Sequence, residues 1–142
     1  MNRLSKNKIV KLVALLMITS VRAAFSQEIE SDFDYLRSPK TTIKGLHRFF
    51  VGMPFGKNLS FGQALYSGAS GDGGGAFFWG FEATKRFPLA PNLNLAMSGF
   101  LGGGGGAAQV VGDGTMWRIG AVGEYALTSN WAIRAGISRL AI

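Results

Sequence analysis

Apolar side chains alternate with small, polar or charged side chains over most of the chain after residue 45. In the segment 77–87, Phe77, Trp79 and Phe81 fall on one face, whereas Glu82 falls on the other. A period of two predicts β-strands. The same alternation predicts six strands, over residues 46–53, 59–67, 76–87, 92–101, 115–127 and 130–140.

Connections of two lengths separate the predicted strands. Asn58, Asn92 and Asn130 each follow a short turn and begin a stretch of alternating apolar residues. Glycine-rich segments, 68–75 and 102–114, join the strands at the opposite end, and we expect each loop to begin at its first glycine. Short turns at one end and long loops at the other predict an antiparallel up-and-down meander, the layout of bacterial outer-membrane barrels.

The length of the predicted strands favours a barrel that crosses a membrane. The segments run about ten residues, close to the 9–11 that a tilted membrane strand needs. Phe87, Tyr125 and Trp131 lie beside the short turns, where an aromatic girdle would meet the membrane interface. Strand propensity alone also favours aromatic residues, and a soluble sandwich would show the same alternation with its faces exchanged. We expect an all-β transmembrane barrel with six to seven strands visible of eight.

The N-terminus is typical of a secretory signal. Residues 1–11 are basic, residues 12–21 form an apolar core, and Ala24-Phe25-Ser26 supplies small residues for a signal peptidase. Ten apolar residues are too few to cross a bilayer of about 30 Å as a helix. We therefore expect residues 1–26 to be a signal peptide that is cleaved before Gln27, and an uncleaved anchor is the alternative. No other segment is apolar enough for a membrane helix, so a mature chain in a membrane would cross it as strands.

The charge of the chain argues against a nucleic-acid partner. The formal net charge is +7, but five of the basic residues lie within the first 26 positions. The rest of the chain carries 10 basic and 8 acidic residues, a net charge of +2, which removes the electrostatic argument for nucleic acid. Residues 27–45 are polar and acidic at first, and we expect a leader with at most one irregular strand near residues 33–36. The barrel domain would then cover residues 46–142.

Charged residues recur on the faces that would line the barrel. An eight-stranded barrel leaves room only for side chains in its interior, and buried charges persist when they are paired. We expect these residues to form a charge network that fills the lumen, and a narrow selective pore is the alternative. The predicted network consists of Glu82, Arg86, Arg118, Glu124 and Arg134.

One segment carries a family resemblance. Residues 123–136, with the core Glu-Tyr-x-Leu-Thr-x-Asn-Trp-x-Ile-Arg, resemble the strand–turn–strand unit of small eight-stranded outer-membrane β-barrel proteins, and residues 80–95 repeat the unit in shorter form. The resemblance covers residues 46–142. It implies an outer-membrane location and insertion by the barrel-assembly machinery. We therefore expect a Gram-negative bacterium and contact with outer-membrane lipid, and we expect no cofactor.

The chain differs from the family pattern at its C-terminus. Members of this family usually end on a closing strand with a terminal aromatic residue, whereas this chain ends Arg139-Leu140-Ala141-Ile142. A bacterial single-chain barrel has an even number of strands. We therefore expect the closing strand to be missing; the alternative is that the leader closes the sheet itself.

The candidate catalytic chemistry is sparse. His47 is the only histidine, which excludes a multi-histidine metal site, and the glycine run 102–106 lacks the helix that a dinucleotide fingerprint needs. His47 would share the outer rim with Ser67, Ser70 and Asp72, so that a base, a hydroxyl and an acid could meet. However, no nucleophile motif surrounds the serines, and a face shared with Phe49 would point His47 toward lipid.

The sequence therefore predicts a non-enzymatic outer-membrane protein with a structural or surface-interaction role, whose surface ligand is unknown. One alternative is a barrel enzyme that acts on lipid acyl chains through His47. The other is a soluble periplasmic β-sheet protein that binds a ligand.

Overall fold

The computed structural model describes residues 10–12, 18–22, 27–37, 42–72, 75–106 and 113–142, and these residues form an all-β fold. No helix in this part of the chain is long and apolar enough to span a membrane. The strands are β1 (Val10–Leu12), β2 (Ile18–Arg22), β3 (Glu28–Tyr35), β4 (Ile43–Pro54), β5 (Leu59–Gly71), β6 (Phe77–Ala90), β7 (Leu93–Gly105), β8 (Thr115–Ala126) and β9 (Trp131–Ala141).

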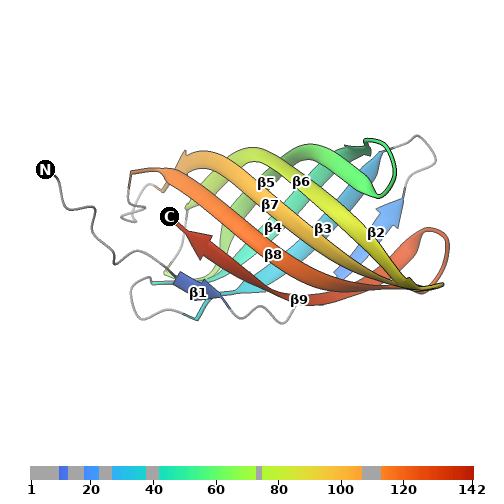
Figure 1. Ribbon diagram of the computed structural model, residues 1–142. Coiled ribbons are helices and arrows are strands. Elements are labelled where there is room, and N and C mark those ends of the chain that lie inside the picture. The colour runs from blue at the N-terminus through green and yellow to red at the C-terminus, as the bar shows by residue number, and fades with distance from the viewer. Residues whose placement is uncertain (1–9, 13–17, 23–26, 38–41, 73–74, 107–112) are drawn as a thin grey trace, which may run out of the picture.

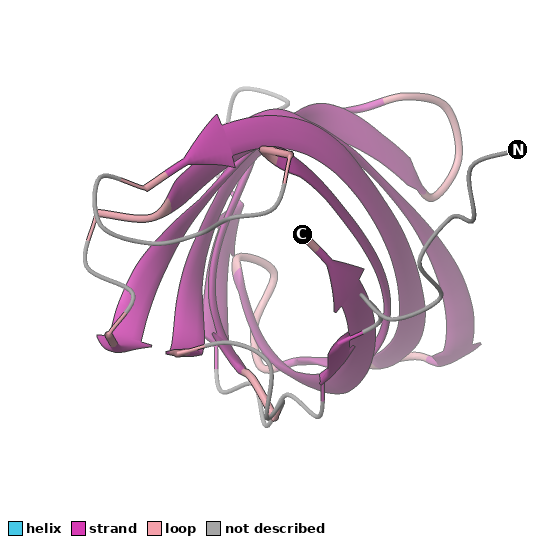
Figure 2. Cartoon of the chain, turned by 90° about the vertical axis from the view of Figure 1, so that its left-hand side faces the viewer, coloured by secondary structure: helices cyan, strands magenta, loops and turns pink. Residues whose placement is uncertain are grey.

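Strands β3 to β9 form an antiparallel meander, in which each strand pairs with the next in sequence. The seven strands tilt together (Figure 1) and curl into a half-barrel around a central axis (Figure 2). The predicted antiparallel meander is confirmed. We call the end with the connections after β4, β6 and β8 the turn end, and the end with the connections after β3, β5 and β7 the loop end.

The two outer strands of this meander are bridged by the N-terminal strands. β2 pairs antiparallel with β3 and with β9, and β1 pairs with β9 nearer the loop end. Both short strands belong to the segment for which the sequence predicted a signal peptide. The predicted cleavage motif, residues 24–26, lies outside the described residues.

The six predicted strands are present as β4 to β9, and several are longer than predicted at the loop end. β5 continues to Gly71 and β7 to Gly105, so the prediction that the loops begin at Gly68 and Gly102 is wrong. Gly102 instead pairs with Gly80. A Cβ atom added to Gly102 would lie only 2.5 Å from Cζ of Phe100 and 2.5 Å from the carbonyl oxygen of Trp79. The glycine is there because the strand packing leaves no room for a side chain.

A regular strand also lies where the sequence predicted a polar leader. β3 pairs with β4 over its whole length, from Glu28 opposite Gly52 to Tyr35 opposite Gly45. Its carboxylates are buried on the inner face, while Phe33 and Tyr35 are exposed on the outer face. The regular sheet therefore begins before residue 46. The acidic residues suggested a solvated leader, because their basic partners lie far away in sequence.

Much of the outer surface is apolar, whereas part of the interior is charged. Large apolar side chains are exposed on the outer surface, for example Trp79 at 51% and Ile119 at 59%. Charged side chains are buried inside, for example Arg48 and Glu82 at 1% each. Because the chain alternates strictly along most strands, every second residue faces each side.

The interior is divided along the barrel axis. An apolar cluster fills it toward the loop end, where Leu36 and Ile43 flank the β3–β4 connection and Leu140 lies near the end of β9. Aromatic rings belong to the same cluster, including Phe78 and Phe100. Charged and hydroxyl-bearing side chains fill the rest of the interior, toward the turn end.

Candidate functional site: a buried charge network

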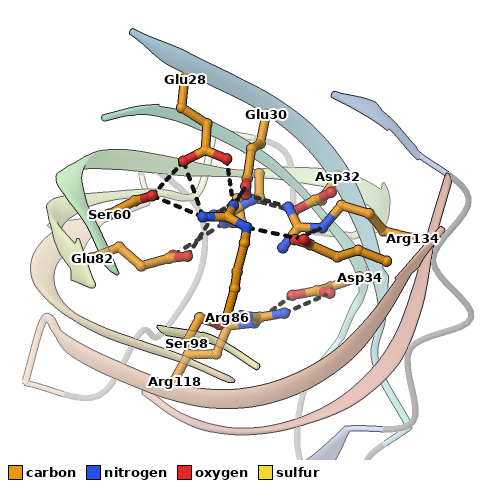
Figure 3. Close-up of polar contacts among 12 residues, drawn as sticks. Glu28, Glu30, Asp32, Asp34, Ser60, Glu82, Arg86, Ser98, Arg118 and Arg134 are labelled. Carbon is orange, nitrogen blue, oxygen red and sulfur yellow. Dashed lines mark hydrogen bonds and ion pairs between the residues drawn. The ribbon is translucent and has the colours of Figure 1, made fainter. Parts of the chain in front are cut away.

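The acidic half of the charge network comes largely from one strand. β3 has a carboxylate at every second position, and all four lie on its buried face. Figure 3 shows these side chains projecting from β3 toward the arginines. A period of two places alternate residues on one face of a strand, so one short segment lines the interior with negative charge. The four residues are Glu28, Glu30, Asp32 and Asp34.

The basic half comes from four other strands. Arg48 on β4, Arg86 on β6, Arg118 on β8 and Arg134 on β9 are all buried. Curling of the sheet brings these strands around β3, so that arginines distant in sequence reach the same carboxylates. Arginine suits this role because its planar guanidinium donates several hydrogen bonds in a fixed geometry.

Glu30 lies at the centre of the network. Its Oε2 atom is 2.8 Å from Nη2 of Arg48, and its Oε1 atom is 2.7 Å from Nη2 of Arg86. Arg134 also donates a hydrogen bond to Oε2 of Glu30. Three strands are therefore connected to β3 through one carboxylate.

Arg48 joins this centre to β6. Its Nε atom donates to Oε2 of Glu82 at 3.1 Å, and its Nη2 atom lies 2.5 Å from Oε1 of the same residue. Arg48 also donates to Asp32, and its guanidinium carbon lies 5.0 Å from the centroid of the Phe50 ring. The hydroxyl of Tyr66 donates to Oε2 of Glu82 at 2.9 Å. These contacts surround the arginine with acceptors and link β3, β4 and β6 across the interior.

Arg86 organises the turn end of the network. Its Nε atom donates to Oε2 of Glu124 at 2.9 Å, and its Nη1 atom donates to Oγ of Ser60 at 2.8 Å. Arg86 also forms an ion pair with Glu28. Glu124 in turn lies 3.1 Å from Nε of Arg134. This half of the interior is a continuous chain of opposite charges.

Arg118 binds Asp34, the carboxylate of β3 that lies nearest the loop end. Its Nε and Nη2 atoms donate to the two carboxylate oxygens of Asp34, at 2.8 and 3.3 Å. A further bond joins Nη1 to Oγ of Ser98 at 3.1 Å. Its guanidinium carbon lies 5.9 Å from the centroid of the Tyr66 ring, which is part of the apolar cluster. A bidentate pair of this kind fixes both partners.

The described interior contains more acid than base. Six buried carboxylates face four buried guanidinium groups, a formal excess of two negative charges. One carboxylate oxygen, Oδ1 of Asp32, is buried without a hydrogen-bond partner among the described residues. The arginines are therefore the scarcer component of the network.

The predicted network residues Glu82, Arg86, Arg118, Glu124 and Arg134 are all buried, and each has an ionic or hydrogen-bonded partner in this network. Sequence reasoning missed Arg48 and the acidic residues of β3. The signal was available in residues 28–35, where carboxylates alternate with Ile, Ser, Phe and Tyr.

A cavity of about 430 Å³ opens at the turn end. Glu28 and Glu124 line it together with residues of the β6–β7 and β8–β9 turns, including Asn92, Asn130 and Trp131. Both glutamates are already bound by Arg86. The cavity is therefore the mouth of the lumen, with its charges largely satisfied by the network.

The structure places His47 directly opposite Ser67, as predicted, and within hydrogen-bonding distance of Ser31, which was not predicted. His47 is exposed on the outer face of β4, and its Nε2 atom lies 2.8 Å from Oγ of Ser31 on β3. Ser70 lies opposite Gly45 in the β4–β5 ladder, and the backbone N–H of Asp72 donates to the carbonyl of Thr42 at 3.2 Å. His47 takes no part in this backbone pairing or in this hydrogen bond.

The three predicted girdle residues lie on the outer surface. Phe87, Tyr125 and Trp131 are exposed, and each is close to a connection at the turn end. No group of three or more histidine, cysteine or acidic residues in the described chain is arranged to hold a metal ion.

The comparisons with known proteins give no family for the chain. No protein-family model, curated protein or solved structure matches it significantly.

Proposed function

We propose that the protein is a small, non-enzymatic β-barrel of a bacterial outer membrane, with a structural or surface-interaction role. The observation that carries the proposal is the apolar outer surface. Aromatic and aliphatic side chains are exposed on every strand from β3 to β9. Soluble monomers rarely expose apolar patches larger than a few hundred Å², whereas lipid requires such a surface.

The interior supports the same proposal. Six of the eight acidic residues of the chain are buried inside, and a polar interior with an apolar exterior is the pattern of membrane barrels. The apolar cluster and the charge network together occupy the interior. A structural role is therefore better supported than the alternative of a selective pore.

The connections and the position of the aromatic residues support a bacterial outer membrane in particular. Short connections at one end, longer ones at the other and aromatic residues near the turn end match the layout of outer-membrane barrels. Phe87, Tyr125 and Trp131 would form the girdle at the periplasmic interface. Insertion would require the barrel-assembly machinery, and the loop end would face the cell surface.

Cell fractionation combined with gel mobility tests the proposal. The outer-membrane fraction is analysed with and without boiling, and the band of the unboiled protein is expected to migrate differently. Recovery of the protein in the soluble periplasm would instead favour the periplasmic binding protein. Recovery in the membrane without a mobility shift would contradict a stably folded barrel.

The hydrogen bond between Ser31 and His47 supports a second candidate function, chemistry on lipid acyl chains at the outer surface. A hydroxyl within hydrogen-bonding distance of an imidazole is the first requirement of a nucleophile–base pair. Phe33 lies directly opposite His47, and Phe49 lies directly opposite Ser31, so apolar side chains surround the pair. The same bond also satisfies two polar groups in an apolar environment, which favours the structural role.

Analysis of the membrane lipids distinguishes the enzymatic function from the non-enzymatic one. Variants Ser31→Ala and His47→Ala are expressed, and acyl chains are compared by mass spectrometry. The proposed non-enzymatic function predicts the same lipids as with the unaltered protein. Loss of an acyl-chain product in both variants, with the gel-mobility shift retained, would establish the enzyme.

A further inference from the structure

The meander from β3 to β9 leaves a seam between its first and last strands. β3 and β9 are not paired directly with each other in the described chain; each of them pairs with β2 instead. An unpaired strand edge in a bilayer would expose N–H and C=O groups that lipid cannot satisfy. Whatever occupies this seam is therefore essential to a membrane barrel.

The backbone register of the N-terminal strands fits the seam. β2 pairs antiparallel with β9 from Ile18 opposite Arg134 to Val21 opposite Trp131. Its last residue, Arg22, lies opposite Glu28 of β3. β1 continues along β9 toward the loop end, with Leu12 opposite Ser138. One N-terminal segment thus follows β9 along most of its length.

The backbone register places this segment beside both parts of the interior. Val10 lies opposite Leu140, a member of the apolar cluster. Arg22 lies opposite Glu28, at the charged turn end.

The number of strands also indicates that one strand position lies between β9 and β3. Seven strands from β3 to β9 are odd in number, whereas bacterial single-chain barrels have an even number. Strands β1 and β2 both pair with β9 on the side away from β8, and together they occupy one strand position. The ring then has eight positions.

We propose that the N-terminal segment that contains β1 and β2 stays attached to the mature protein and closes the barrel as its eighth strand. The segment would serve twice, first as an export signal and then as a structural strand. This inference rests on the proposed membrane barrel, and it replaces the predicted cleavage before Gln27.

Intact mass spectrometry and cross-linking test the inference on the full chain. The membrane-extracted protein is weighed, and cysteine pairs are introduced at Thr19/Ile133 and Ser20/Ala132. Adjacent antiparallel pairs alternate between narrow and wide spacing, so one of these two pairs is the narrow one. The protein has no native cysteine, so any disulfide reports the introduced pair. Thr19→Cys with Gly99→Cys is the matched control, because Gly99 lies on β7, which pairs with β6 and β8.

The expected result is a mass that includes residues 1–26, together with a disulfide in at least one seam pair and none in the control. A mass that begins at Gln27 would overturn the inference. A retained N-terminus whose seam pairs cross-link no more than the control would also overturn it, because the segment would then be a simple anchor. Absence of the protein from the outer membrane would instead contradict the proposed function.

Discussion

Arg48 shows how single residues stabilise the interior. It contacts three carboxylates, from Glu30, Asp32 and Glu82. Among the residues whose burial the structure describes, the interior contains more carboxylates than arginines. Removal of an arginine therefore leaves buried negative charge without a partner, whereas removal of a surplus carboxylate leaves most pairs intact.

We expect Arg48→Met to lower the free energy of unfolding by about 3–5 kcal/mol, the usual cost of breaking a buried ion pair from one side. Asp32→Asn is the matched variant, because Oδ1 of Asp32 has no hydrogen-bond partner in the described chain. Its effect is expected to be about 1 kcal/mol or less. Urea unfolding in lipid vesicles, followed by tryptophan fluorescence, measures both; equal losses would contradict the role of arginine as the scarcer component.

A substitution at Ile119 tests whether the outer surface faces lipid or water. It is exposed near the middle of β8, so an arginine there would face lipid in the proposed barrel. We expect Ile119→Arg to cost about 2–4 kcal/mol of unfolding free energy in vesicles. In water, an exposed substitution of this kind usually changes stability by only about 0.5 kcal/mol.

Leu127→Arg is the control for this substitution. Leu127 is also exposed, but it lies in the turn after β8. The cost of a lipid-facing arginine falls to about 0–1 kcal/mol near the interface. A similar small effect at both positions would argue that the surface of β8 faces water.

At the scale of strands, the sequence predicts the position of a strand correctly where one face is apolar and the connections are short. β6 and β9 were predicted with their faces correctly assigned, because aromatic and aliphatic residues recur with a strict period of two. β3 was not recognised as a regular strand. Its Glu-Ile-Glu-Ser-Asp-Phe-Asp-Tyr pattern also alternates, but four carboxylates favour a solvated segment when their partners are unknown. Arg48 was missed for the same reason.

The loop-end strand boundaries depend on packing that no local pattern reveals. β7 runs through four glycines of the 102–105 segment, which as sequence are typical of a loop. The ring of Phe100 lies against Gly102, as the 2.5 Å approach of an added Cβ atom to Cζ indicates. An aromatic ring that covers a glycine is a known device for stabilising a strand, and it requires the three-dimensional fold to be seen.

Two glycines on β7 provide a direct test of this packing. Gly102→Ala would place a Cβ atom against the Phe100 ring and the neighbouring backbone, and we expect a loss of about 1–3 kcal/mol, typical of overpacking. At Gly99 an added Cβ atom meets nothing within 4 Å, so Gly99→Ala is expected to be neutral or slightly stabilising. Thermal unfolding monitored by gel mobility compares the two; a reversed order would contradict the packing argument.

For the whole molecule, the filled interior predicts that the barrel does not conduct ions. The apolar cluster occupies the interior near the loop end, and the charge network crosses the rest of it. Planar-bilayer recordings are expected to show no steady channel current for the purified protein. Reproducible, voltage-independent conductance that survives repurification would contradict this prediction and favour the selective pore.

The contact between Glu30 and Arg134 has a consequence for how the chain reaches its final state. The two residues are 104 positions apart in sequence, and other pairs in the network bring β3 together with β6 and β8. Contacts of such long range slow folding, because the entropy of closing a long loop is lost before the contact forms. Glu30 and Asp32 can meet Arg48 early, because β4 follows β3 directly, but the network is complete only when Arg134 of β9 is in place. We therefore expect the meeting of β3 with the C-terminal strand to be the slow step of folding.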